Sequence, residues 1–282
     1  MGREIVPESL GGGQQHVPAG SRLLLLDTTG NLHSLYHPDR VLTGCYWDVL
    51  ATLPSLVPPG PLGLLGLGAG TVPRAIAAHF RCGPGGDGDS SSYVVHGWEL
   101  DPGVVMAGRM YLGMAELERS GQLVVYTGDA LAPTASIPGG FSGIIVDLFS
   151  KGCLLPQLTE RATWESLRSR LAPIPGSRLI ANLGQAPAAA QPGSPAAAAA
   201  QATGLALEAL REVFEGEVSM LTVEENTLIL TGPTPGPEEW PGRLPDGLRH
   251  LGAPHHWERV RGGGAVAVGG GGARTGEPER RL

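Results

Sequence analysis

The stretch from Leu62 to Phe80 constrains the fold most, because it has the pattern of a strand, a glycine turn and a helix. Apolar residues lead into three closely spaced glycines, Gly66, Gly68 and Gly70. Thr71 fits a helix cap, and apolar residues then recur at helical spacing. A loop of this kind lets a ligand approach bare backbone at the positive end of a helix dipole. We therefore expect a ligand-binding strand–loop–helix unit.

Strands and helices alternate after this unit. The expected strands lie at 93–99, 123–126, 143–146 and 178–182, followed by an antiparallel pair at 217–222 and 226–231. Helical signals lie between them: one opens at Asp101–Pro102, and others cover about 159–171 and 203–214. This order predicts an α/β fold, a Rossmann-like and mostly parallel sheet with helices on both faces.

The chain divides into three expected regions. Residues 1–57 hold a predicted β-hairpin at Ser21–His37 and a short helix. Residues 58–232 form the α/β domain, in which the Ala/Pro/Ser-rich segment 184–200 is expected to be a disordered insertion. Residues 233–282 are rich in proline and glycine, and we expect them to be mostly unstructured.

Composition excludes several classes of function. The net charge is -7, with Lys151 the only lysine, which argues against a nucleic-acid partner. No apolar run reaches the roughly 18 residues that a membrane span needs. The three cysteines and the histidines lack metal-ligand spacing, so we expect no metal and a reducing compartment. The N-terminus lacks secretory and transit signatures, so we expect a soluble intracellular protein, cytoplasmic rather than plastid.

Polar or glycine residues lie at the carboxyl ends of four of the predicted strands. These strand ends carry the glycine loop 66–70, Glu99, Asp129 and Asp147. In an open parallel sheet, ligands bind beyond the carboxyl ends of the strands. The four strand ends therefore predict one binding site.

Two kinds of nucleotide fit such a site. A nicotinamide dinucleotide needs G-x-G-x-x-G and an acid about 20 residues later. Here Thr71 stands at the third glycine position, and Glu99 comes late. A G-x-G-x-G loop, an acid that ends the second strand and Gly-Asp-Ala after the third strand favour a nucleoside of the S-adenosylmethionine type.

From about Ser21 to Thr231 the chain resembles the spermidine synthase family, a branch of the class I methyltransferase fold, and in particular its plant and algal relatives. The segments that carry the resemblance are Tyr46–Pro54, Gly66–Thr71, Trp98–Asp101, Gly128–Ala130 and Ile144–Asp147. The resemblance implies a seven-stranded Rossmann-like domain behind a small N-terminal β-hairpin. It also implies a small-molecule acceptor and a homodimer.

The resemblance further implies S-adenosylmethionine or its decarboxylated form as co-substrate. Glu99 would accept hydrogen bonds from the ribose hydroxyls, Asp129 would bind the adenine amino group, and Asp147 would be the general base or would orient the amine. The implied cofactor-binding residues are Gly66, Gly68, Ala69, Gly70, Glu99, Leu100, Asp129 and Ala130. The implied substrate-binding residues are Tyr46, Trp47 and Asp48.

Three positions depart from the family pattern. Ala69 replaces an aspartate that holds the ammonium of the decarboxylated cofactor, Trp47 replaces a glutamine, and Ser150 replaces a second acid. Losing the carboxylate at position 69 should relax the selection against the ordinary cofactor. Three hypotheses stay open: an aminopropyl transferase, a small-molecule methyltransferase, and a non-catalytic nucleoside-binding or interaction protein.

Overall fold

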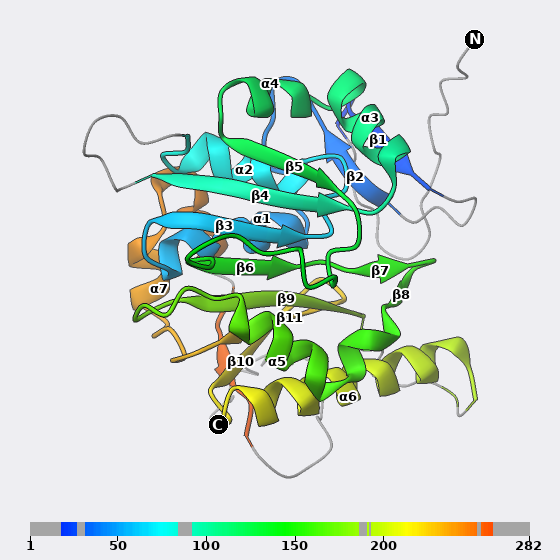
Figure 1. Ribbon diagram of the computed structural model, residues 1–282, viewed down its shortest axis with the longest axis vertical. Coiled ribbons are helices and arrows are strands. Elements are labelled where there is room, and N and C mark those ends of the chain that lie inside the picture. Colours follow the sequence, from blue (N-terminus) through cyan, green and yellow to red (C-terminus); the bar gives the residue numbers. More distant parts are fainter. Residues whose placement is uncertain are drawn as a thin grey trace, which may run out of the picture.

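The central element is an eight-stranded sheet with strand order β12-β10-β11-β9-β6-β3-β4-β5 (Figure 1). The computed structural model describes residues 18–26, 32–83, 92–185, 191, 193–252 and 255–261. The parallel strands are β3 (Gly60–Leu65), β4 (Tyr93–Glu99), β5 (Leu123–Thr127), β6 (Gly143–Val146) and β9 (Arg178–Gln185). The antiparallel strands are β10 (Val218–Val223), β11 (Asn226–Thr231) and β12 (Glu258–Arg259). The predicted seven-stranded, mostly parallel sheet is confirmed, and β12 adds a short eighth strand.

Helices cover both faces of this sheet (Figure 1). One face carries α1 (Tyr46–Leu50), the short 3₁₀ turn η1 (Leu53–Leu56) and α2 (Thr71–His79). The other face carries η2 (Pro156–Thr159), α5 (Arg161–Ser169) and α6 (Pro195–Val213). The helices α3 (Pro102–Tyr111) and α4 (Met114–Arg119) connect β4 to β5. Because apolar side chains of the strands point to both faces, the sheet separates two hydrophobic cores.

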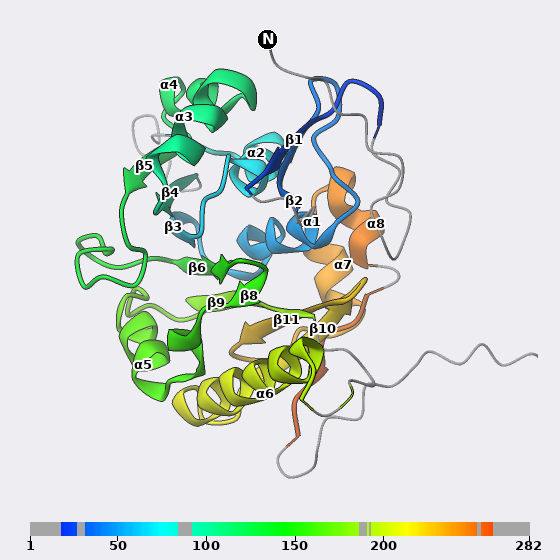
Figure 2. The same cartoon turned by 90° about the vertical axis from the view of Figure 1, so that its right-hand side faces the viewer.

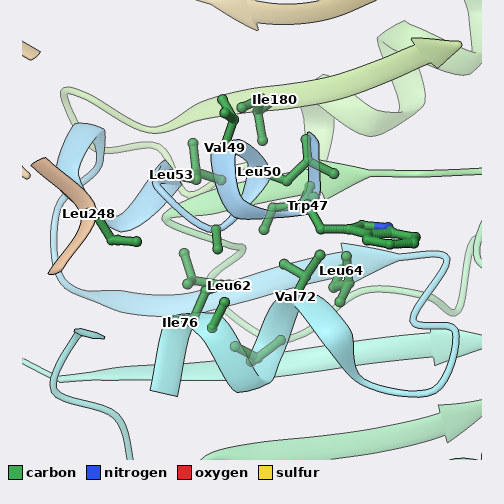
Figure 3. Close-up of a cluster of buried hydrophobic side chains, with 14 of the residues drawn as sticks. Trp47, Val49, Leu50, Leu53, Leu62, Leu64, Val72, Ile76, Ile180 and Leu248 are labelled. Carbon is green, nitrogen blue, oxygen red and sulfur yellow. The ribbon is translucent and has the colours of Figure 1, made fainter. Parts of the chain in front are cut away.

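The core beneath α1 and α2 joins segments that are distant in the sequence (Figure 3). Leu62 and Leu64 of β3 pack against Val72 and Ile76 of α2, with Leu50 of α1 alongside. All five side chains are almost fully buried. This packing fixes the glycine loop, because the loop is the only link between β3 and α2.

A separate two-stranded hairpin lies at the carboxyl-end edge of the sheet. It consists of β1 (Arg22–Leu25) and β2 (Leu32–Tyr36), which pair antiparallel. The predicted N-terminal hairpin is confirmed, and its turn lies outside the described residues. A second small hairpin, β7 (Phe149–Ser150) and β8 (Cys153–Leu154), follows β6 and was not predicted.

The prediction of an unstructured segment after residue 232 is wrong for residues 233–252 and 255–261. These residues form α7 (Glu239–Arg243), the 3₁₀ turn η3 (Asp246–Leu248), α8 (Arg249–Gly252) and β12. Their large apolar residues are buried in the core beneath α1 and α2: Trp240, Leu244, Leu248, Leu251 and Trp257. A few well-spaced apolar side chains outweigh the proline and glycine content once a core is there to receive them. Residues 262–282 lie outside the described part.

The prediction of a disordered insertion at 184–200 is also wrong in part. Helix α6 begins at Pro195, and the Ser194 hydroxyl caps it by accepting a hydrogen bond from the Ala197 N–H at 3.2 Å. A cap followed by proline and a run of alanines is a strong helix start, and the low-complexity composition concealed it. Residues 186–190 and 192 lie outside the described part.

Replacing Trp240 by alanine should lower the free energy of unfolding by about 3–5 kcal/mol, the usual cost of removing a large buried side chain. Trp240 is 2% exposed, and its ring centroid lies 5.9 Å from that of Trp257. Urea denaturation followed by circular dichroism measures the change. The Arg243→Ala variant is the matched control, because this arginine is half exposed and its ion pair with Glu239 contributes below about 1 kcal/mol. Equal effects of the two changes would show that the segment after residue 232 does not support the core.

Candidate functional site

The glycine loop and the predicted acids meet at the carboxyl ends of the parallel strands, which face the viewer in Figure 2. Gly66 has a φ of +92°, and a Cβ atom there would lie 2.1 Å from the backbone oxygen of Asp147. The Asp147 N–H in turn donates to the Leu65 oxygen at 2.8 Å. Only glycine permits this approach, so the end of β6 is held directly against the start of the loop.

Every N–H group of the loop from Gly66 to Gly70 already donates a hydrogen bond within the protein. Gly66 and Leu67 both donate to the Trp98 oxygen, at 3.1 and 2.8 Å. Gly68 donates to Glu99 Oε2 at 2.9 Å, Ala69 to Ser34 Oγ at 2.8 Å, and Gly70 to the Leu67 oxygen at 3.3 Å. A pyrophosphate held by a glycine loop needs free N–H groups there. The N–H groups of residues 66–70 therefore orient the loop itself, and a ligand would contact the loop through other atoms.

Helix α2 starts differently from the prediction. Gly70, with a φ of +94°, occupies the N-cap position, and Thr71 is the first helical residue, so the prediction of Thr71 as the cap is wrong. The Thr71 hydroxyl instead contacts β2, where it accepts from the Leu35 N–H at 3.1 Å and donates to the Leu35 oxygen at 3.2 Å. The hydroxyl is used for a tertiary contact, because the glycine supplies the turn without a side-chain cap.

Glu99 ends β4 and is fixed on both carboxylate oxygens. Oε2 accepts from the Gly68 N–H at 2.9 Å, and Oε1 accepts from the Asp101 N–H at 3.0 Å. The side chain is half-buried, and each oxygen keeps a further lone pair. Leu100, next in the chain, is 71% exposed. The carboxylate is thus a preoriented acceptor for a pair of donors, beside an exposed apolar side chain.

Asp129 and Ala130 follow β5 in a loop that an unpredicted arginine holds in place. Asp129 is exposed, and its Oδ1 accepts from the Leu131 N–H at 2.8 Å, a turn that leaves Oδ2 available. Arg170 is 6% exposed, and its guanidinium donates to the oxygens of Ala130 at 2.7 Å and Leu131 at 2.9 Å. An arginine near the end of a predicted helix carries no sequence signal for this role, because most such residues are solvated.

Asp147 lies in a small polar cluster with Tyr46 and Asn182. The Tyr46 hydroxyl donates to Oδ2 at 3.2 Å, and the Asn182 side-chain amide donates to Oδ1 at 3.0 Å. Burial raises the pKa of Asp147 to about 6, against the hydrogen bonds from Asn182, Tyr46 and Trp47, which lower it. Burial also raises the pKa of Tyr46 well above its ordinary value, and the Asp147 charge adds to this, so Tyr46 stays a donor. The cluster can take up a proton near neutral pH.

Asn182 is the residue of this cluster that the sequence analysis missed. It is 1% exposed, and its Oδ1 accepts from the Gly184 N–H at 2.9 Å, which fixes the amide orientation. Strands β6 and β9 are parallel neighbours with Val146 opposite Ala181, so the next residues, Asp147 and Asn182, also lie side by side. A polar residue at the end of the predicted strand 178–182 was the available signal.

The acceptor-side candidates on α1 have different surroundings. Trp47 is 4% exposed and packs in the core (Figure 3). Its ring centroid lies 4.9 Å from that of Tyr46. Asp48 is 1% exposed, and its carboxylate accepts from the N–H and hydroxyl groups of Thr43 and from the Gly44 N–H. Tyr46 and Trp47 therefore lie next to Asp147. The side chain of Asp48 instead points into the protein interior, where its hydrogen bonds hold the loop before α1.

In the part of the chain that the structure describes, no group of three or more His, Cys, Asp or Glu side chains could hold a metal ion. Within the same part, no helix is both long and apolar enough to cross a bilayer.

The Asp147→Asn variant should be more stable than the wild type at pH 8, by on the order of 2–3 kcal/mol, because it removes the cost of burying a charge. The carboxyl has a folded pKa of about 6 and an ordinary value of 3.8. The favourable contribution of its protonated form is therefore fully present below the ordinary value and is lost as the pH rises through the folded value. Urea unfolding of both proteins between about pH 4 and pH 8 checks this. A stability difference that stays constant over that range would contradict a desolvated carboxyl.

No family model matches the chain, and no curated protein matches it in sequence. Solved structures do resemble it. A probable spermidine synthase from Corynebacterium glutamicum aligns with a TM-score of 0.55 and 16% identity, over 86% of this chain and 88% of that chain. The spermidine synthase from Thermotoga maritima aligns with a TM-score of 0.51 and 16% identity, over 72% of this chain. The alignment spans 63% of the Thermotoga chain, less than two thirds of its length.

An O-methyltransferase family protein from Burkholderia thailandensis aligns with a TM-score of 0.46 and 13% identity, over 66% of this chain and 55% of that chain. At these identities a structural likeness shows the fold alone. The predicted fold is confirmed: the chain has the Rossmann-like α/β architecture, which it shares with these two structures, and a small N-terminal hairpin.

Proposed function

We propose that this protein binds S-adenosylmethionine or its decarboxylated form and transfers an aminopropyl or methyl group from it to a small acceptor. The observation that carries the proposal is Glu99, which Gly68 and Asp101 hold at the end of β4 with acceptor capacity to spare. The N–H groups of residues 66–70 are engaged within the protein, so the loop would present its glycine backbone surface to the nucleoside.

Each strand end has a role in holding such a nucleoside. The two hydroxyls of a ribose are adjacent donors, and a carboxylate with two oriented oxygens matches them. Asp129 keeps one carboxylate oxygen for the amino group of adenine, and Leu100 offers an exposed apolar surface beside the ring. The glycines keep side chains out of the path of the ribose and the amino-acid tail.

The acceptor side is built around Asp147. The sulfonium of the bound co-substrate makes its attached carbons electrophilic, so the acceptor must present a deprotonated nucleophile. With a pKa of about 6, Asp147 is mostly charged at neutral pH and can receive the acceptor proton. Tyr46 and Asn182 each donate to one of its oxygens, so the carboxylate faces the acceptor in one orientation.

The charges on this side favour an acceptor with one amine or hydroxyl near Asp147 over a longer polyamine. A polyamine carries several ammonium groups, each of which needs a carboxylate partner. Asp48 is buried against Thr43 and Gly44, and the β7–β8 turn after Asp147 presents Ser150 and Lys151 rather than an acid. Ala69 stands where the spermidine synthase pattern has an acid. This favours the alternative in which a methyl group is transferred from S-adenosylmethionine.

Calorimetry should detect binding of S-adenosylmethionine, its thioether product or the decarboxylated cofactor. The Glu99→Gln variant should weaken that binding at least about tenfold, because an amide cannot keep both backbone hydrogen bonds and accept two hydroxyls. Glu118→Gln is the control, since Glu118 of α4 pairs with the partly exposed Arg109 of α3. No heat with any of the three ligands would refute both enzyme hypotheses and leave the non-catalytic one.

The wild type should bind S-adenosylmethionine and its decarboxylated form with affinities within about tenfold of each other. The physical reason is that residue 69 carries no carboxylate to repel the carboxylate of the ordinary cofactor. Competition calorimetry with the two compounds measures the ratio. A preference of about a hundredfold for the decarboxylated form would mean that another group provides the selection and would restore the aminopropyl hypothesis.

A further inference from the structure

The hairpin β1–β2 docks on the glycine loop rather than on the body of the sheet. Ser34 Oγ accepts from the Ala69 N–H at 2.8 Å and donates to the His33 oxygen at 2.6 Å. The Thr71 hydroxyl pairs with both backbone groups of Leu35. A Cβ atom at Gly68 would lie 2.9 Å from Ser34 Oγ, so the hairpin limits the space on this side of the loop.

A third contact strengthens this docking on the next turn of α2. The Arg74 guanidinium donates to the His37 oxygen at 3.0 Å and to the Arg40 oxygen at 2.6 Å. The same guanidinium lies 4.3 Å from the ring centroid of Tyr36, a cation–π contact. An isolated two-stranded hairpin is marginally stable, so β1–β2 depends on these contacts for its structure.

We propose that the hairpin is a part of the nucleoside site and that Ser34 and Thr71 are positioning residues for it. The inference rests on the proposed function. Neither hydroxyl is assigned a contact with the ligand. Ser34 holds the N–H of residue 69, in the middle of the loop, and Thr71 holds the first turn of α2 against β2. Gly68, between Ser34 and Glu99, is thereby fixed so that its N–H orients the carboxylate that receives the ribose.

Docking of the hairpin and binding of the nucleoside are coupled in both directions. If docking of the hairpin favours the loop geometry that binds the nucleoside, the bound nucleoside must favour the docked hairpin by the same factor. The two hydroxyls are well suited to carry this coupling, because Ser34 is 1% and Thr71 6% exposed and neither competes with water for its partners.

Two variants test the proposal, Ser34→Ala and Thr71→Val, each of which removes the hydroxyl with little change in volume. Thr71→Ser keeps the hydroxyl and is the conservative rescue. Ser169→Ala is the control, because its hydroxyl bonds only to the Ser166 oxygen on α5. We expect Ser34→Ala and Thr71→Val to weaken S-adenosylmethionine binding about tenfold, and Thr71→Ser and Ser169→Ala to stay within about twofold of the wild type.

Hydrogen exchange of the free protein provides a readout that needs no ligand. Ser34→Ala and Thr71→Val should speed exchange at the amides of residues 68–70 relative to the sheet, whereas Ser169→Ala should not. In the wild type, S-adenosylmethionine should slow exchange in β2. Wild-type affinity in both variants, or unchanged exchange at 68–70, overturns the proposal. A wild type that binds no S-adenosylmethionine while the variants do speed loop exchange refutes the proposed function and leaves the positioning of the loop in place.

Discussion

The rest of the site depends on one close approach, that of the Asp147 backbone to Gly66. The carbonyl at the end of β6 occupies the space that a side chain at position 66 would need. This approach sets the acid of one strand beside the ligand loop of its neighbour, and the hydrogen bond from the Asp147 N–H to Leu65 keeps it there. A methyl group at this position would separate the nucleoside side of the site from the acceptor side.

Most of the polar groups around the site serve to position other groups. Glu99 and the glycine loop hold each other in place through the hydrogen bond from Gly68. Arg170 holds the loop after Asp129, and Asn182 fixes the orientation of Asp147. Such an arrangement costs stability, since the partly buried Asp147 carboxylate has a raised pKa and the buried Arg170 guanidinium bonds only to neutral oxygens. The two cores on either side of the sheet supply the stability that offsets this cost.

Sequence patterns predicted the regular elements well and the long-range contacts poorly. β4 and β6 have the predicted bounds, because β4 is a mostly apolar run that ends in an acid and β6 is a continuous apolar run with an acid directly after it. The first half of α6 and the elements after residue 232 were missed, because their composition resembles that of disordered chains. Thr71, placed as a cap on local grounds, contacts a strand more than thirty residues earlier, which no local pattern encodes.

The sequence by itself determined the alternation of strands and helices, the glycine loop and the acids at the strand ends. These features depend on periodicity and backbone freedom, which are local. Only the tertiary structure decided which side chains surround each acid. It placed Asp147 between Tyr46 and Asn182, turned Asp48 into the interior, and put the hairpin hydroxyl of Ser34 on the loop. Those outcomes depend on which strands become neighbours, and strand order is fixed by the packing of the whole chain.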